Sequence, residues 1–196
     1  MEFAKRLDKI PPYLFVEISR KIAQKKAEGV NVVSFGIGDP DLPTPTRIIE
    51  TLRGAAFDSP NHRYPETDGL PEFRKAFASW CQRRFDVSLD PDKEVLPLIG
   101  AKEGIGHVAL GLLDPGDIAL VPDPGYPVYS AGTWFAGGEC HWMSLKEENG
   151  WMPDLGAIPK DVANKTKVMW LNYPNNPTGS VASLPCVKAK TSKLSK

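Results

Sequence analysis

Apolar residues recur at helical spacing near the start of the chain. Leu14, Ile18 and Ile22 share one face of a predicted helix. This helix covers residues 12–28, and Gly29 suits the position just after its C-terminus. The pattern therefore predicts an amphipathic helix with one apolar face.

Turn and cap residues mark three further elements before residue 90. Val32–Phe35 is a predicted short strand that ends at Gly36. Thr44 resembles an N-cap followed by proline at the first helical position, which predicts a helix as far as Ala56. Pro71 opens another predicted helix. The apolar stripe of that helix consists of Phe73, Phe77, Trp80 and Cys81.

From residue 95 onward, strand patterns alternate with helix patterns. The predicted strands cover residues 95–99, 118–121, 140–143 and 167–171. The predicted helices cover residues 101–112 and 127–135, with a short one at 154–162. Such alternation predicts right-handed crossover units and a mostly parallel sheet, so the fold class is α/β.

Composition narrows the function classes. The 196 residues are 41% hydrophobic and 24% charged, which is typical of a globular protein. A net charge of zero argues against a nucleic-acid or membrane-surface role driven by bulk charge. The N-terminal residues show no secretory signal, and no window resembles a membrane span. We therefore expect a cytoplasmic protein.

The cysteines and histidines do not form a recognisable site. The three cysteines are odd in number and far apart, so we expect reduced thiols (Cys81, Cys140 and Cys186). The three histidines are not at metal-ligand spacing (His62, His107 and His141). We expect no metal site.

The last segment, Ser180–Lys196, differs in composition from the rest. It holds four lysines, four serines and no acidic residue. Low hydrophobicity with charge of one sign predicts disorder. Binding of an acidic partner is the alternative interpretation of this basic segment.

Gly100, Ala101 and Lys102 lie where a predicted strand turns into a predicted helix. Backbone N–H groups at a helix start attract anions, and small residues allow a phosphate to approach the backbone. A plain strand-to-helix turn is an equally good interpretation of this segment alone.

Tyr126 follows the next predicted strand and therefore lies at the same edge of the sheet. Its position between Gly125 and Pro127 suits an aromatic ring that stacks on a planar ligand. A rigid turn with a packing aromatic residue is the alternative.

Three other residues have modest individual signals. Gly38, in a glycine-rich turn, could bring the backbone close to a ligand, although a simple turn explains it as well. Tyr64 could present a phenol donor or be a loop aromatic. Asn176 could donate its amide to a ligand oxygen or stabilise an Asx-type turn.

The order and spacing of these five segments resemble the class I/II aminotransferases of fold type I, which use pyridoxal 5′-phosphate (PLP). The resemblance extends from Leu14 to about Gly179, and within the family it is greatest to LL-diaminopimelate aminotransferases. One family motif is only partly kept, because Ser34-Phe35-Gly36 stands where a leucine is expected. The other matching segments are Tyr64–Arg74, Gly100–Gly104, Pro122–Tyr129, Phe135–Glu139, Leu145–Gly150, Pro153–Leu155 and Asn175–Gly179.

The resemblance implies a role for each of the singled-out residues. Ala101 and Lys102 would offer backbone amides to the cofactor phosphate. Tyr126 would stack on the pyridine ring, and Asn176 would hydrogen bond to its O3′. Tyr64 would reach the phosphate of the neighbouring subunit's cofactor, which implies a homodimer.

The resemblance also implies a fold, a substrate class and a division of the chain. The backbone of Gly38 would meet the substrate carboxylate. The reaction would move an amino group between an amino acid, LL-diaminopimelate in the closest group, and a 2-oxo acid such as 2-oxoglutarate. The fold would be the three-layer large domain of PLP-dependent transferases, left incomplete. Residues 1–40 would be an arm and the start of a small domain, 41–179 a partial PLP-binding domain, and 180–196 an atypical tail.

Three residues that the family requires have no match in this chain. They are the lysine that attaches PLP covalently, the aspartate beside the pyridine nitrogen and the arginine that clamps the substrate carboxylate. Lys102 matches the phosphate motif, and Lys193 lacks the surrounding family motifs. We therefore expect a chain truncated after Gly179, with no catalytic residue of its own and no activity alone.

Other functions remain open from the sequence. The chain could act on another amino acid, or be a carbon–sulfur lyase of the same fold. It could be a non-catalytic remnant that pairs with an intact homologue. A transcription regulator with an aminotransferase-like domain would need a helix-turn-helix module, for which residues 1–13 leave no room.

Overall fold

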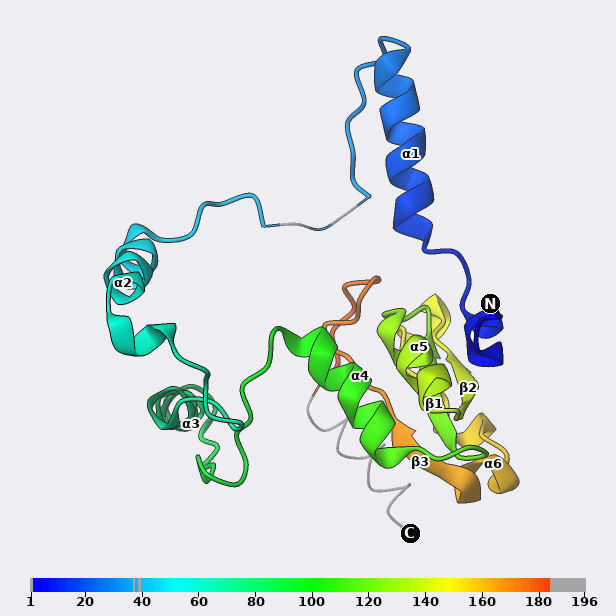
Figure 1. Cartoon of the computed structure of the whole chain (residues 1–196). Coiled ribbons are helices and arrows are strands. Elements are labelled where there is room, and N and C mark those ends of the chain that lie inside the picture. Colours follow the sequence, from blue (N-terminus) through cyan, green and yellow to red (C-terminus); the bar gives the residue numbers. More distant parts are fainter. Residues whose placement is uncertain (1, 37, 39, 184–196) are drawn as a thin grey trace. The chain divides into compact units, whose positions relative to one another are not determined.

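The computed structural model describes residues 2–36, 38 and 40–183, which form two compact units (Figure 1). Unit 1 combines Met1–Pro11 with Leu98–Lys196, and unit 2 is Pro12–Pro97. The domain boundaries predicted from the sequence, at residues 40 and 179, divide the chain differently from these two units, and they stay predictions.

Unit 2 is helical. It contains α1 (Leu14–Ala27), α2 (Thr46–Ala56), the short 3-10 helix η2 (Ser59–His62) and α3 (Pro71–Phe85). The prediction for α1 is confirmed within two residues at its N-terminus, and α3 begins at Pro71 as expected. Helix α2 starts later than predicted, because Pro45 rather than Thr44 takes the N-cap position.

Two sequence interpretations in unit 2 need correction. The predicted strand Val32–Phe35 is wrong, since these residues form no ladder and the Phe35 side chain is 94% exposed. A strand needs a hydrogen-bonding neighbour, and no described residue supplies one here. The predicted apolar stripe of α3 is half-exposed except at Cys81. The residues of α3 that are buried are Arg74, Ala78 and Cys81.

Arg74 is the main polar anchor of unit 2. Its guanidinium is 5% exposed and pairs with the carboxylates of Asp68 and Asp92. One of its terminal nitrogens also donates to the backbone carbonyl of Asp68 at 3.1 Å. Arg74 therefore ties α3 to the segments that precede and follow it.

Unit 1 has the α/β fold that the sequence predicts. The sheet order is β2-β1-β3, and both strand pairs are parallel. The strands are β1 (Ile118–Asp123), β2 (Glu139–Ser144) and β3 (Thr166–Met169). The helices are η1 (Lys5–Lys9), α4 (Ala101–Leu112), α5 (Val128–Phe135), η3 (Glu147–Asn149), η4 (Leu155–Ala157) and α6 (Lys160–Lys165).

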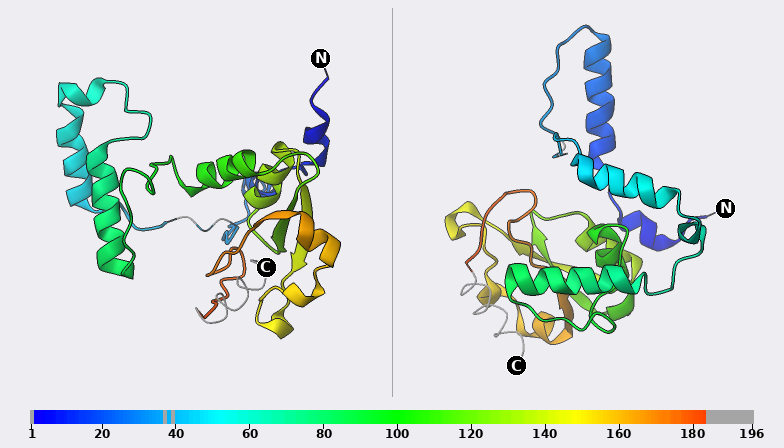
Figure 2. Two further views of the ribbon diagram at one scale, coloured as in Figure 1. Left: turned by 90° about the horizontal axis from the view of Figure 1, so that it is seen from below. Right: turned by 90° about the vertical axis from the view of Figure 1, so that its left-hand side faces the viewer.

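The core of unit 1 lies where α4 and α5 pack on one face of the sheet. Its buried members come from α4, β1, α5 and β3, and include Ala109, Val121, Tyr129 and Val168. Residues of β2 alternate between the faces: Trp142 contacts a tryptophan of α5, whereas Met143 faces the segment between β2 and β3. The sheet is thus covered on both sides (Figure 2).

Local patterns predict the elements of unit 1 well, with two exceptions. Helix α4 has the predicted bounds, whereas the predicted strand 95–99 is wrong because no strand in the described part of the chain pairs with it. The predicted helix 154–162 is also wrong. Its residues form η4 and then the start of α6, with Pro159 at the N-cap position of α6 and the Asp154 side chain capping η4.

The structure bears on two further expectations. Among the described residues, no helix is long and apolar enough to cross a membrane. Residues 184–196, which make up most of the predicted disordered segment, lie outside the described residues.

Candidate functional site

The loops that follow β1 and β3 leave neighbouring parallel strands at the carboxyl edge of the sheet, which we call the β1–β3 edge. From β1 the chain passes to β2 on one side, and β3 then lies on the other side of β1. Ligands of open parallel sheets bind outside the carboxyl ends of the strands. The loop after β1 carries Tyr126, and the loop after β3 carries Asn176.

The first turn of α4 lies at this edge. Figure 1 shows the start of α4 and the orange loop after β3 at the same end of the sheet. The Lys102 ammonium nitrogen is 5.8 Å from the ring centroid of Tyr126. Three chain segments, distant in sequence, are therefore joined at one end of unit 1.

Gly100 prepares the start of α4 for a ligand. Its backbone has φ 83° and ψ 154°, a conformation that essentially only glycine adopts, and an added Cβ would meet open space. As the N-cap it has no side chain to bond to the first-turn amides. The Glu103 carboxylate lies in the first turn, but it accepts a hydrogen bond at 2.6 Å from the N–H of Ile99, which precedes the helix. No described residue accepts a hydrogen bond from the backbone amides of Ala101 and Lys102, and unpaired amides at a helix start attract anions.

The loop that carries Tyr126 is closely packed. A Cβ on Gly125 would overlap the carbonyl oxygen of Pro122, so only glycine fits at this approach. The Tyr126 ring is half-buried and meets the ring of Tyr129 edge to face, with centroids 5.9 Å apart. The ring of Tyr126 is thereby held beside the first turn of α4.

The Asn175–Gly179 turn separates the roles of its two asparagines. Asn175 is buried, and its side-chain amide donates to Thr178 Oγ1 at 2.9 Å. Asn176 is exposed, and its backbone N–H donates to Asn172 Oδ1 at 2.9 Å. Among the described residues none hydrogen bonds to the Asn176 side chain. The turn is thus stabilised by its neighbours, which leaves the Asn176 amide available.

Gly38 and Tyr64 belong to unit 2. The Tyr64 side chain is fully exposed, and an added Cβ on Gly38 would meet nothing within 4 Å. Of the residues predicted from the sequence, the structure places Ala101, Lys102 and Tyr126 together. Asn176 lies on the loop that leaves the same sheet edge.

Two aromatic residues at this site were not identified as candidates from the sequence. Tyr129 lies in the first turn of α5 and Trp170 directly follows β3. Their rings stack, with centroids 5.2 Å apart and planes at 15°. Burial, and secondarily the neighbouring Tyr126, raises the pKa of the Tyr129 hydroxyl above its ordinary value. Tyr129 lies three residues after Tyr126, and this spacing is the signal in the sequence that could have identified Tyr129.

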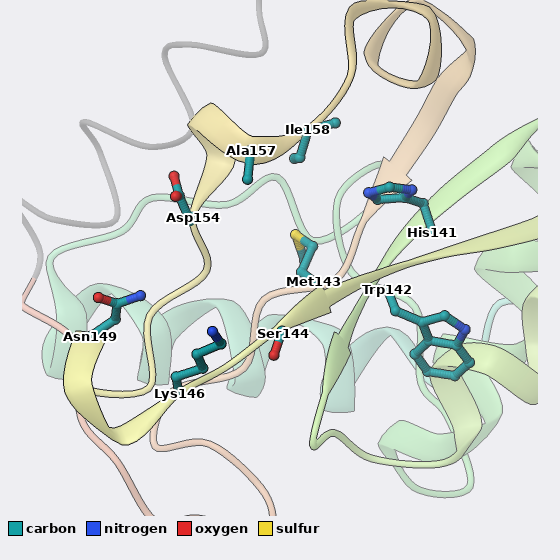
Figure 3. A pocket seen from close by; sticks show the side chains of 9 residues that line it. All are labelled: His141, Trp142, Met143, Ser144, Lys146, Asn149, Asp154, Ala157 and Ile158. Atoms are coloured by element: carbon teal, nitrogen blue, oxygen red, sulfur yellow. The ribbon is translucent and has the colours of Figure 1, made fainter.

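A cavity of about 290 Å³ lies elsewhere in unit 1 (Figure 3). It is bounded by β2 and by the segment that contains η3 and η4. Two of its polar groups already have partners: Lys146 pairs with Glu148, and Asp154 accepts from the Gly156 N–H. None of the predicted cofactor residues lines this cavity, so it is distinct from the β1–β3 edge.

The sequence of the chain matches one family model. Residues 30–190 match the model described as aminotransferase class I and II. Among curated proteins, the LL-diaminopimelate aminotransferase of Dehalococcoides mccartyi is 60% identical over 188 residues, which is 96% of this chain and 48% of that protein. The corresponding protein of Aquifex aeolicus is 54% identical, over 95% of this chain and 48% of its own length.

Solved structures are also similar to this chain over its whole length. Substrate-bound BacF from Bacillus subtilis has a TM-score of 0.90 and 39% identity, covering 100% of this chain and 49% of that one. An aspartate aminotransferase variant from Thermus thermophilus has a TM-score of 0.89 and 28% identity, covering 100% and 50%. The chain spans about half the length of the curated relatives that it matches.

Proposed function

Because the chain belongs to the class I and II aminotransferases, a PLP-dependent family, we propose that it supplies the PLP cradle of such an enzyme. The single observation that carries the proposal is the joining of the α4 start, Tyr126 and the Asn176 loop at one sheet edge. The uncapped first turn of α4 and the open space at Gly100 fit a phosphate group.

Each residue of the cradle has a separate task in this proposal. The backbone amides of Ala101 and Lys102 donate to the phosphate, and the Lys102 ammonium adds positive charge nearby. Tyr126 offers its ring face to the pyridine ring. The exposed amide of Asn176 donates to the ring oxygen O3′. Bound PLP supplies an electron sink for the carbanion that forms when the substrate Cα–H bond breaks.

The substrates and the assembly are part of the same proposal. The backbone of Gly38 binds the carboxylate of an amino acid, with LL-diaminopimelate and a 2-oxo acid such as 2-oxoglutarate as the reacting pair. Relatives up to 60% identical support this substrate. Tyr64, whose side chain is fully exposed, reaches the phosphate of a second subunit in a homodimer. The free thiols of Cys81 and Cys140 agree with a cytoplasmic location.

The cradle does not by itself supply the whole reaction. No described residue is matched to the lysine that attaches PLP, to the aspartate at the ring nitrogen or to the arginine that clamps the substrate. We therefore expect the purified chain, free of any full-length homologue, to show no turnover of LL-diaminopimelate with 2-oxoglutarate. Measurable turnover, followed as glutamate formation, would refute this expectation.

Cofactor binding is tested with pyridoxine 5′-phosphate, which lacks the aldehyde and cannot bond covalently to surface lysines. Calorimetry on the purified chain compares it with pyridoxine, which lacks the phosphate. We expect a preference of at least about tenfold for the phosphorylated form, since charge-assisted hydrogen bonds each contribute roughly 1.5–3 kcal/mol. Equal binding of the two compounds would overturn the proposed cradle.

A pair of variants locates the phosphate contact. Lys102→Met removes the ammonium beside Tyr126 and is expected to reduce the preference several-fold. Lys160→Met removes an exposed lysine at the start of α6, away from the β1–β3 edge, and is expected to leave the preference unchanged. Equal effects of the two variants would mean that general positive charge, rather than the α4 start, attracts the phosphate.

A further inference from the structure

We propose that Tyr129 is a positioning residue for the cofactor ring. Its ring holds the ring of Tyr126 edge-on and stacks on Trp170, so that one aromatic side chain contacts both the loop after β1 and the residue that leads into the loop after β3. The inference rests on the proposed function, because it requires the pyridine ring of PLP to lie on Tyr126. The group that acts is the ring of Tyr129, and its hydroxyl is dispensable.

The first contact controls the plane of Tyr126. The two tyrosine rings are 5.9 Å apart with an interplanar angle of 83°, which is the edge-to-face arrangement that aromatic pairs favour. Among the described residues, Tyr129 is the only aromatic side chain in contact with Tyr126. Tyr129 is itself 6% exposed and lies in the first turn of α5, so it is a rigid support. A smaller side chain there would let the Tyr126 ring turn.

The second contact reaches the residue that directly follows β3. Trp170 stacks on Tyr129 at 5.2 Å, and its backbone N–H donates to the carbonyl of Leu120 at 3.0 Å. The indole N–H of Trp170 is buried and has no hydrogen-bond partner among the described residues. The indole is therefore held by packing alone, and the stack with Tyr129 is its main directional contact. From Trp170 the chain continues directly to the loop of Asn176.

The hydroxyl of Tyr129 has no visible task. No described residue hydrogen bonds to it, and burial disfavours its ionised form. A phenylalanine has the same ring and can make both aromatic contacts. A leucine is apolar and of similar length, but it can make neither contact. The pair Tyr129→Phe and Tyr129→Leu thus separates the ring from the hydroxyl.

The test measures two affinities for each variant. Calorimetry on the full chain gives the dissociation constants of pyridoxine 5′-phosphate and of inorganic phosphate. For Tyr129→Leu we expect pyridoxine 5′-phosphate to bind about three- to tenfold more weakly, the effect of losing an aromatic pair, with phosphate affinity unchanged. For Tyr129→Phe we expect both affinities to match the wild type.

A matched control removes an aromatic contact from the same helix but away from the β1–β3 edge. Trp134 of α5 meets Trp142 of β2 edge-on, with centroids 6.3 Å apart. Trp134→Leu is expected to leave both affinities unchanged. Trp170→Leu removes the stack from its other side and should reproduce the selective loss, which provides the test if Tyr129→Leu does not fold.

Each outcome decides between the inference and its premise. If the wild type binds pyridoxine 5′-phosphate no better than pyridoxine, the cradle and the inference both fail. If the cradle stands and Tyr129→Leu binds like the wild type, only the inference fails. A parallel loss of both affinities would show a merely structural role for Tyr129. A loss in Tyr129→Phe equal to that in Tyr129→Leu would show that the hydroxyl is the active group.

Discussion

Gly100→Ala is the sharpest test of how the backbone builds the cradle. Gly100 has φ 83° and ψ 154°, and a Cβ at this position would touch nothing within 4 Å. The substitution therefore adds no clash and removes no contact. Its whole effect on the folded state is the strain of an L-residue in a region that only glycine populates, about 1–3 kcal/mol. We expect the free energy of unfolding of unit 1 to fall by that amount.

The same helix offers a matched control. Gly106 lies inside α4, and a Cβ there would also meet nothing within 4 Å, but its φ is not positive. Alanine is favoured over glycine inside a helix by roughly 0.5–1 kcal/mol. Gly106→Ala should therefore stabilise unit 1 while Gly100→Ala destabilises it. The same glycine-to-alanine change is thus expected to raise the free energy of unfolding at one position and to lower it at the other.

Tryptophan fluorescence during urea unfolding measures both effects. Trp80 is the one tryptophan of the sequence in unit 2, so a Trp80→Phe background confines the signal to unit 1. The tryptophans that remain are Trp134, Trp142, Trp151 and Trp170. If Gly100→Ala is as stable as its parent, or if both variants shift stability in the same direction, the backbone argument is refuted.

Three other substitutions follow from single contacts. Burial raises the pKa of the Cys140 thiol to about 11, so this thiol should react slowly with a disulfide reagent at pH 8. The folded state favours the protonated thiol. The contribution of this thiol to stability is therefore present below its ordinary pKa and is lost as the pH rises through about 11. Cys140→Ala should abolish this loss of stability at alkaline pH. Arg74→Met should destabilise unit 2 by less than the roughly 3–5 kcal/mol of a wholly buried pair, because both carboxylate partners are largely exposed and can rehydrate. Trp80 fluorescence measures this loss, and a larger one would contradict the argument. Gly125→Ala should destabilise unit 1 by about 1–3 kcal/mol, because its Cβ would overlap the backbone oxygen of Pro122; an unchanged urea midpoint would contradict this.

The aromatic contacts show where sequence reasoning about the site reached its limit. The turn at Gly125 and Pro127 marks Tyr126 as a candidate, because glycine and proline are local signals. Nothing local indicates that Trp170, which directly follows β3, stacks on Tyr129 of α5. That contact exists because β1 and β3 are neighbours in the sheet, and strand order is a property of the whole chain.

The sequence by itself determined what depends on near neighbours along the chain. The bounds of α4, the alternation of strands and helices and the turn at Gly100 follow from periodicity and from backbone preference. Only the tertiary structure decided which apolar runs become strands, since residues 32–35 and 95–99 have strand composition but no partner strand among the described residues. It also decided that Asn175 is buried while Asn176 faces out. Strand pairing and burial need atoms from distant segments, and a local pattern contains no information about which segments will arrive.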